Sequence, residues 1–271
     1  MLDRLKGFLA DEGINCVGCI PFSEVNILSP HLVPDGAKSA ILFLIPYDTG
    51  RKFSDGVSVY AHVPDYHGYF AGLCERVLQK FHTAFPEAEI FGFADHSPID
   101  EKSAAAKAGL GVIGCNSLLI NPVYGSYVFI GSFLINTELP YSVYEIGSCL
   151  RCGKCKEGCP GKAISEQGFD TRACLSALSQ KKKLSQDETN KLAKCGISWG
   201  CDRCQEICPM NKKRRYSPIA FFENNVHGDF TSAEIAAMDD AVFASYAFSW
   251  RGRERITQNL QNLEQKNEKT V

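Results

Sequence analysis

Nine of the thirteen cysteines in this chain lie between Cys149 and Cys208. The first four occur in CLRCGKCKEGCP, which has the spacing C-x2-C-x2-C-x3-C-P (Cys149, Cys152, Cys155 and Cys159). This spacing is typical of bacterial ferredoxins, in which three thiolates bind one 4Fe–4S cluster and the cysteine before proline binds the other. The residue types and their spacing therefore predict electron-transfer chemistry.

A second motif, CDRCQEICP, repeats the C-x3-C-P ending, and one further cysteine stands between the two motifs. The crossover of ligands between clusters predicts two sets of four. The first set is Cys149, Cys152, Cys155 and Cys208, and the second is Cys159, Cys174, Cys201 and Cys204. Cys195 has no place in either motif and is expected to be a free thiol.

Zinc is the main alternative for these cysteines, because CxxC pairs are common in zinc sites. Zinc favours two separate pairs rather than three cysteines at x2-x2 spacing with C-x3-C-P twice. Disulfides are rare in the reducing cytosol, and the N-terminus lacks the apolar stretch of a signal peptide. The sequence therefore favours two 4Fe–4S clusters.

Composition limits the location and the partners. The formal net charge is -2, which does not indicate a broadly basic nucleic-acid binder. No apolar run approaches the roughly 20 residues that a membrane span needs. We therefore expect a cytoplasmic protein without a membrane partner.

The elements that must position the cysteines follow from hydrophobic periodicity. Helices are expected over 2–11, 66–85, 101–108, 232–244 and 251–265. Strands are expected over 15–20, 38–47, 89–94, 118–120 and 127–135. This alternation predicts an α/β (α+β) domain over residues 1–141. A ferredoxin-like double-cluster domain over 142–212 and a C-terminal helical segment over 213–271 are expected to follow.

The first domain is expected to receive the electrons. GLGVIG, at Gly109–Gly114, fits G-x-G-x-x-G but follows an expected helix, so the context for dinucleotide binding is missing.

Three segments resemble the epoxyqueuosine reductase family, which consists of cobalamin-dependent iron–sulfur enzymes of tRNA modification. They are YAHVPDYHGYF (60–70), ADHSPIDEKSAAAKAGLGVIGCNSLLINPVYGSYVFIG (94–131) and the cysteine array with RACLSALSQKKK and WGCDRCQEICPMN. The middle segment is similar to the family's DxxPxxExxxAxxAGLGxxGKNxLLI pattern and makes the match specific.

The resemblance implies base-off cobalamin in the first domain, beside a cluster. It implies reduction of the epoxide of epoxyqueuosine in tRNA to the alkene of queuosine, with an external low-potential electron donor. The departing oxygen needs a general acid, and the resemblance gives that role to Asp95. It places cofactor contacts at His67, Cys115, Leu119, Gly125 and Ser126.

Each of these assignments has a structural alternative. Asp95 could cap the following helix. Glu101 and Lys102 could form an exposed ion pair of little energetic consequence. His67 could be a histidine at the start of a helix with only local hydrogen bonds.

The chain departs from the family pattern in three places. Cys115 stands where the family has lysine, and Ala177 where it has tyrosine. The chain ends at Val271, whereas longer members carry a helical-repeat region, so a short form is expected.

Basic residues suggest an RNA surface, because affinity for RNA depends largely on phosphate charge. The candidates are Lys181, Lys182, Lys183, Lys212, Lys213, Arg214, Arg215, Arg251, Arg253 and Arg255. They predict binding of a tRNA anticodon stem-loop, although solvated charges are the simpler explanation of any one run. Two other functions remain open: a cobalamin-dependent reductase of a small molecule, similar to reductive dehalogenases, and a non-catalytic electron carrier.

Overall fold

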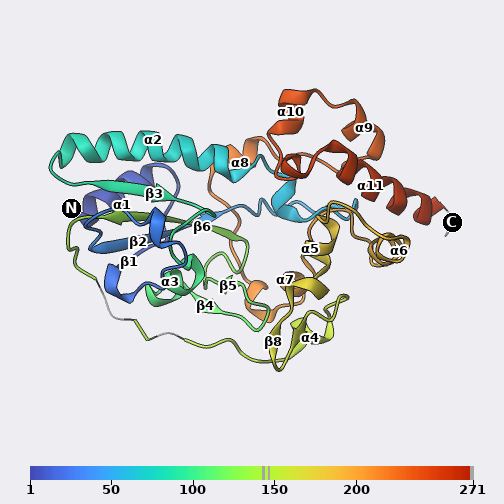
Figure 1. Ribbon diagram of the computed structural model, residues 1–271, viewed down its shortest axis with the longest axis horizontal. Coiled ribbons are helices and arrows are strands. Elements are labelled where there is room, and N and C mark those ends of the chain that lie inside the picture. The colour runs from blue at the N-terminus through green and yellow to red at the C-terminus, as the bar shows by residue number, and fades with distance from the viewer. Residues whose placement is uncertain (142–143, 146, 269–271) are drawn as a thin grey trace.

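The computed structural model describes residues 1–141, 144–145 and 147–268 (Figure 1). The first part contains α1 (Leu2–Asp11), β1 (Val17–Pro21), β2 (Ser39–Pro46), α2 (Tyr66–Ala84), β3 (Ile90–Phe93), α3 (Glu101–Lys107), β4 (Val112–Ile113), β5 (Leu119–Ile120) and β6 (Val128–Ile135). The remainder contains α4 (Lys154–Glu157), β7 (Ile164–Ser165), β8 (Gly168–Phe169), α5 (Leu175–Ser179), α6 (Gln186–Lys194), α7 (Arg203–Glu206), α8 (Ala220–Asn224), α9 (Ser232–Ala237), α10 (Asp240–Ala244) and α11 (Arg253–Glu268).

The central sheet has the order β1-β2-β6-β3, and all of its strand pairs are antiparallel. Strand β2 is buried along its whole length, as its apolar run predicts. Successive side chains of a strand point to opposite faces. Accordingly, Ile41, Phe43 and Ile45 pack in the core that includes residues of α1 and α2, while Leu42 and Leu44 pack with the alanines of α3.

Two aspartates begin the helices that border the candidate active site. Asp65 caps α2 by accepting a hydrogen bond from the backbone N–H of His67, and Asp100 caps α3 by accepting one from the backbone N–H of Ser103. Such caps satisfy backbone donors that a helix cannot satisfy internally. The capping role that was the alternative for Asp95 therefore belongs to Asp100.

The C-terminal segment divides between two cores. Ile219 and Phe222 complete the core of the first domain, where Phe222 packs against Tyr69 of α2 at a ring distance of 5.3 Å. Figure 1 shows α8 beside α2, and α9, α10 and α11 grouped together above α5 and α6. Trp199 is fully buried in a separate core with residues of these three helices.

These contacts bear on the expected division into 1–141, 142–212 and 213–271. The third part contributes to two cores: Ile219 and Phe222 pack in that of the first domain, whereas most residues of the core around Trp199 belong to 213–271 itself. Residues 142 and 271, which bound two of these parts, lie outside the described residues. The division therefore stays a prediction.

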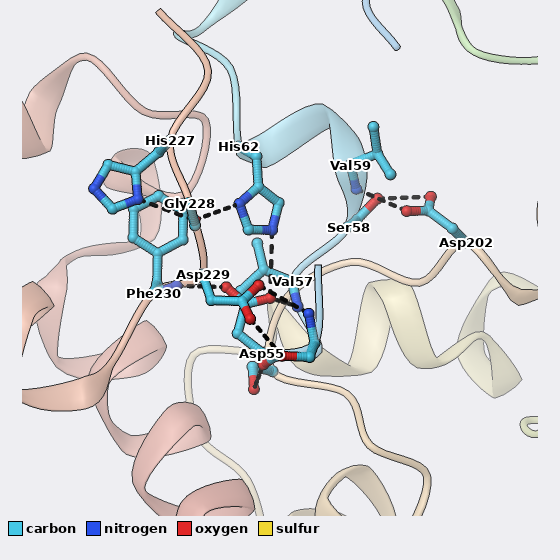
Figure 2. A network of polar contacts seen from close by, with 12 residues as sticks. Asp55, Val57, Ser58, Val59, His62, Asp202, His227, Gly228, Asp229 and Phe230 are labelled. Carbon is cyan, nitrogen blue, oxygen red and sulfur yellow. Dashed lines mark hydrogen bonds and ion pairs between the residues drawn. The ribbon is translucent and has the colours of Figure 1, made fainter. Parts of the chain in front are cut away.

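A buried polar network ties residues 53–64 to the C-terminal segment (Figure 2). Asp55 accepts hydrogen bonds from the backbone N–H groups of Val57 (3.0 Å) and Phe230 (2.7 Å). His62 lies 3.3 Å from Asp55 through Nε2 and 3.0 Å from the Gly228 carbonyl oxygen through Nδ1. Because all the side chains involved are buried, these contacts fix the position of the loop before α9.

The expected single helix over 232–244 is two helices. Helix α9 ends at Ala237, and Asp239 then accepts hydrogen bonds from the backbone N–H groups of Ala241 and Val242 to begin α10. Aspartate competes with helical hydrogen bonding and favours a new N-cap, which explains the break. The final helix begins at Arg253, two residues later than expected.

Among the described helices, none is both long enough and apolar enough to cross a membrane.

Candidate functional site

The first predicted set of cysteines surrounds one cavity. Its lining contains all four thiols of that set, Cys149, Cys152, Cys155 and Cys208, together with a fifth, Cys115. The structure therefore brings together cysteines up to 59 positions apart in the order that the crossover predicts. The cavity lies between the cluster segment and the turn that follows β4.

The second predicted set is also brought together. Cys201 lies close enough to Cys159 and Cys174 for their charges to interact. The same is true of Cys204 with respect to Cys201 and Cys174. Burial and these neighbouring charges raise the pKa of both Cys201 and Cys204 to about 12. Thiols crowded in this way are held as thiolates by bound metal, so the residues fit an iron–sulfur site.

Backbone N–H groups point at the sulfur atoms of both sets. Ala163 donates to Cys159 at 3.3 Å, and the N–H groups of Arg151 and Lys156 donate to Cys149 and Cys155. Left-handed residues make the turns that allow this: φ is +49° at Arg151, +77° at Gly153 and +55° at Lys162. Hydrogen bonds to cluster sulfurs are among the factors that set reduction potentials.

Among the described residues, no three or more His, Cys, Asp or Glu side chains lie close enough to hold a single metal ion.

One turn of the first domain touches both cysteine sets. The backbone N–H and the thiol of Cys115 donate hydrogen bonds to the Cys149 sulfur, and the side chain of Asn116 donates one to the Cys204 sulfur. Burial raises the pKa of Cys149, but these donors and that of Arg151 bring it below its usual value. The sequence did not predict the role of Asn116; a polar residue beside Cys115 in a glycine-rich turn was its only signal.

Asp202 joins the second set to the first domain. It follows Cys201 in the sequence, and its side chain is buried. It accepts hydrogen bonds from the Ser58 hydroxyl and the Val59 N–H, both at 2.7 Å (Figure 2). Burial raises its pKa above the usual value. The turn at 115–116 and Asp202 are therefore among the contacts that hold the cluster segment on the first domain.

The predicted acid Asp95 lies two residues after the end of β3, beside the start of α2. Its φ is +64°, a conformation that non-glycine residues rarely adopt and that occurs often at functional sites. Its carboxylate is 3.7 Å from His67 Nε2, and the His67 Nδ1 atom is 2.6 Å from Asp65. His67 thus has the local hydrogen bond of the structural alternative and also lies beside Asp95. Both side chains are about half exposed, at 48% for His67 and 62% for Asp95, so a ligand can reach them.

Glu101 is a second carboxyl group at this place. Burial raises its pKa to about 8. Hydrogen bonds from the Asp95 backbone N–H and from the hydroxyls of Ser132 and Ser97 act in the opposite direction and lower the pKa, but by less. A carboxyl group with this pKa is mostly protonated at neutral pH. The alternative of an ion pair with Lys102 is wrong, because Lys102 instead donates to the Ser117 carbonyl oxygen at 3.1 Å.

Aromatic rings form one wall beside these carboxyl groups. Tyr66 stacks on Phe129 of β6 at a ring distance of 4.0 Å, and its pKa lies above the usual range because of burial and the charges of Asp95 and Glu101. Flat apolar surfaces of this kind suit a large planar cofactor.

Three expected cofactor contacts are engaged within the protein. Leu119 is buried in the core under α3. Ser126 donates its backbone N–H to Asn211 at 2.9 Å and its hydroxyl to Gln205 at 2.9 Å. Gly125 has a φ of +62°, and a side chain there would meet the Asn211 amide oxygen at 2.4 Å. The structure places Gly125 and Ser126 against Asn211 of the cluster segment, and the cofactor contacts of all three residues stay predictions.

The basic residues fall into two groups. Three of them pair within the protein: Lys181 with Glu188 (2.7 Å), Arg214 with the buried Asp48 (2.6 Å) and Arg253 with Asp240 (2.6 Å). Others are exposed, including Lys182, Lys183, Lys212, Lys213 and Arg215.

Comparison with known proteins agrees with this site. Residues 148–211 match the family model described as a 4Fe–4S double cluster binding domain. An epoxyqueuosine reductase of Cellulophaga algicola is 31% identical over 211 residues, covering 76% of this chain and 68% of that protein.

Two solved structures share the fold. That of an epoxyqueuosine reductase from Streptococcus thermophilus has a TM-score of 0.84 and 20% identity, covering 98% of this chain and 81% of that one. A second epoxyqueuosine reductase was solved with an epoxyqueuosine-modified stem-loop of tyrosine tRNA; it has a TM-score of 0.79 and 21% identity, covering 97% and 80%.

The fold and the two cysteine sets define an iron–sulfur oxidoreductase with two 4Fe–4S clusters, as the cysteine spacing predicts. At 31% identity over most of its length, the chain belongs to the epoxyqueuosine reductase family.

Proposed function

We propose that this protein reduces the epoxide of epoxyqueuosine in tRNA to the alkene of queuosine, using cobalamin and two 4Fe–4S clusters. The observation that carries the proposal is the 31% identity to an epoxyqueuosine reductase, across both the Asp95 segment and the cysteine array. The overall reaction consumes two electrons and two protons and releases the epoxide oxygen as water.

Asp95 supplies a proton to the departing oxygen in this proposal. Its carboxylate faces outward beside His67, and its backbone is held by the hydrogen bond to Glu101. General acids of this kind contribute a factor of about 100 to 10,000 to the rate. Glu101, which accepts the hydrogen bond from the Asp95 backbone, is mostly protonated at neutral pH. It therefore adds no second negative charge beside the acid.

The clusters deliver the electrons. In this proposal the first cluster is bound by Cys149, Cys152, Cys155 and Cys208, and the second by Cys159, Cys174, Cys201 and Cys204. Cobalamin, when bound, supplies a strongly nucleophilic and reducing cobalt centre. Family membership supports this cofactor, and the Tyr66–Phe129 stack with the exposed His67 and Asp95 is the surface that this chain offers to it.

The proposed partners are a tRNA anticodon stem-loop and an external low-potential electron donor in the cytoplasm. A stem-loop is bound in the solved structure of one relative, which shares the fold with this chain. The exposed Lys212 and Lys213 follow directly from the second cysteine motif and are the cations we assign to phosphate contacts.

The experiment is anaerobic reconstitution with iron, sulfide and cobalamin, followed by single-turnover assay of an epoxyqueuosine-containing stem-loop. We expect conversion to queuosine, detected by mass spectrometry of the nucleosides as loss of one oxygen. An unchanged stem-loop with fully loaded protein, under conditions where a small epoxide is reduced, would instead establish a small-molecule reductase. If neither substrate is reduced, a non-catalytic electron carrier is the function that remains.

A further inference from the structure

The first cluster cavity contains one thiol more than a 4Fe–4S cluster uses. Four irons take four cysteine ligands, but five cysteines line this cavity. The additional one, Cys115, comes from the turn after β4 in the first domain and not from the cluster segment. It is exposed, whereas Cys208 in the same lining is buried.

Cys115 is in direct contact with one ligand of the predicted set. Its thiol donates a hydrogen bond to the Cys149 sulfur, and its backbone N–H donates to the same atom. It also lies within electrostatic range of Cys155. The Cys115 and Cys149 sulfurs therefore lie at the same corner of the cavity.

We propose that Cys115 is a reserve ligand of the first cluster, which can bind the iron at the corner that Cys149 occupies. The hydrogen bond already provides the route for the exchange. In the exchange Cys115 would give its proton to Cys149 while the iron–sulfur bond to Cys149 is replaced by one to Cys115, so no electron would be gained or lost. The proposal depends on the first cluster and not on the identity of the substrate.

The exchange would join the cluster to the domain that carries Asp95. With Cys149 as ligand, all four ligands belong to the cluster segment. With Cys115 as ligand, one bond reaches the turn whose next residue, Asn116, donates to the second set at Cys204. Hydrogen bonds to the sulfurs and solvent exposure both change the reduction potential of a cluster, so the two states would differ in potential.

The test is the iron content of anaerobically reconstituted alanine variants of the full chain. We expect about eight irons per chain in the wild type, in Cys149→Ala and in Cys115→Ala, because one thiol remains for the corner in each. We expect about four in the double variant Cys149→Ala/Cys115→Ala. The matched control is Cys155→Ala. Its iron content should fall to about four per chain whether or not Cys115 is present.

Two results overturn the proposal. One is a loss of about four irons in Cys149→Ala alone, and the other is a double variant that keeps all eight. A second measurement does not depend on survival of the Cys149 variants. Electron paramagnetic resonance of reduced Cys115→Ala should show altered g values for one of its two clusters, while Cys195→Ala should match the wild type. Identical spectra in all three proteins would show that Cys115 does not contact the cluster.

Discussion

Nε2 of His67 lies 3.7 Å from the carboxylate of Asp95, although His67 belongs to the first turn of α2 and Asp95 follows β3. An imidazole at this distance can hold a water molecule against the carboxylate. Asp95 is therefore placed beside a polar side chain as well as in an exposed turn.

Replacement of Asp95 by asparagine should preserve the fold, the clusters and cobalamin binding but lower turnover by a factor of about 100 to 10,000. Asparagine tolerates the positive φ of this position but has no proton to give. Single-turnover conversion of a modified stem-loop measures the effect. Asp100→Asn is the matched control, because asparagine also caps α3 and should leave turnover unchanged; near-normal turnover of Asp95→Asn would remove the residue from the mechanism.

Cys174 should be essential for one cluster, whereas Cys195 should not. Cys174→Ala is expected to lose about four of eight irons, because it removes a ligand of the second set. Cys195→Ala should keep all eight, since that thiol packs in the small core around Leu192. Iron and sulfide analysis of both variants decides between them, and equal iron contents would refute the assignment of Cys174.

Glu101 should make stability depend on pH. Its pKa is about 8 in the folded protein and close to 4.5 in the unfolded chain, so the folded state binds the proton more tightly. Its contribution to stability is complete below pH 4.5 and is lost as the pH rises from there to about 8, by up to about 1.4 kcal/mol per pH unit.

Glu101→Gln keeps a neutral, hydrogen-bonding side chain and should remove this dependence. Anaerobic denaturation of both proteins between pH 5.5 and 8, at intervals of about half a unit, follows the difference. We expect the variant to gain stability relative to the wild type with rising pH. A constant difference would mean that Glu101 is ionised in the folded protein.

The sequence predicted the central sheet and the helices α1, α2, α3 and α11, because their signals are local. The apolar run of β2 and the periodicity of α2 each occupy one stretch of chain. The break between α9 and α10 was missed, since Asp239 looks like an exposed helical residue until its side chain is seen to cap. The spacing of the cysteines predicted which thiols would meet.

Contacts between distant segments could not be predicted in the same way. The hydrogen bond of Cys115 to Cys149 joins residues in different parts of the molecule, and no pattern in either segment specifies the other. The pairing of Arg214 with Asp48 likewise joins two distant segments that no local pattern relates. It removes Arg214 from the expected RNA-binding residues, because its guanidinium is already held by a buried carboxylate and lies 4.2 Å from the Tyr127 ring.

RNA binding should accordingly depend on Lys212 and Lys213 and not on Arg214. Lys212→Glu/Lys213→Glu should weaken stem-loop binding and lower the slope of log affinity against log salt by about 1.5 to 2. A double reversal at Lys6 and Lys80, in α1 and α2, changes the net charge equally and is the control. Equal losses in the two variants would indicate a general effect of net charge rather than a binding surface.

The buried network around Asp55 should contribute strongly to stability. Asp55→Ala leaves the N–H groups of Val57 and Phe230 without an acceptor and should cost roughly 2–4 kcal/mol. Asp229→Ala removes a carboxylate that serves the exposed Ser54 and should cost less than about 1 kcal/mol. Fluorescence of Trp199 and Trp250 during denaturation reports both; similar losses would show that burial of the network is not decisive.

The return of Phe222 to the first core has a consequence for biosynthesis. On the ribosome, residues 1–141 emerge first, but the surface of α2 around Tyr69 is covered only when α8 has been made. By then every cluster cysteine, from Cys149 to Cys208, has also been synthesised. Completion of the N-terminal core therefore follows the appearance of the metal ligands, so that cofactor insertion and the last step of folding fall in the same interval after translation of the cysteine motifs.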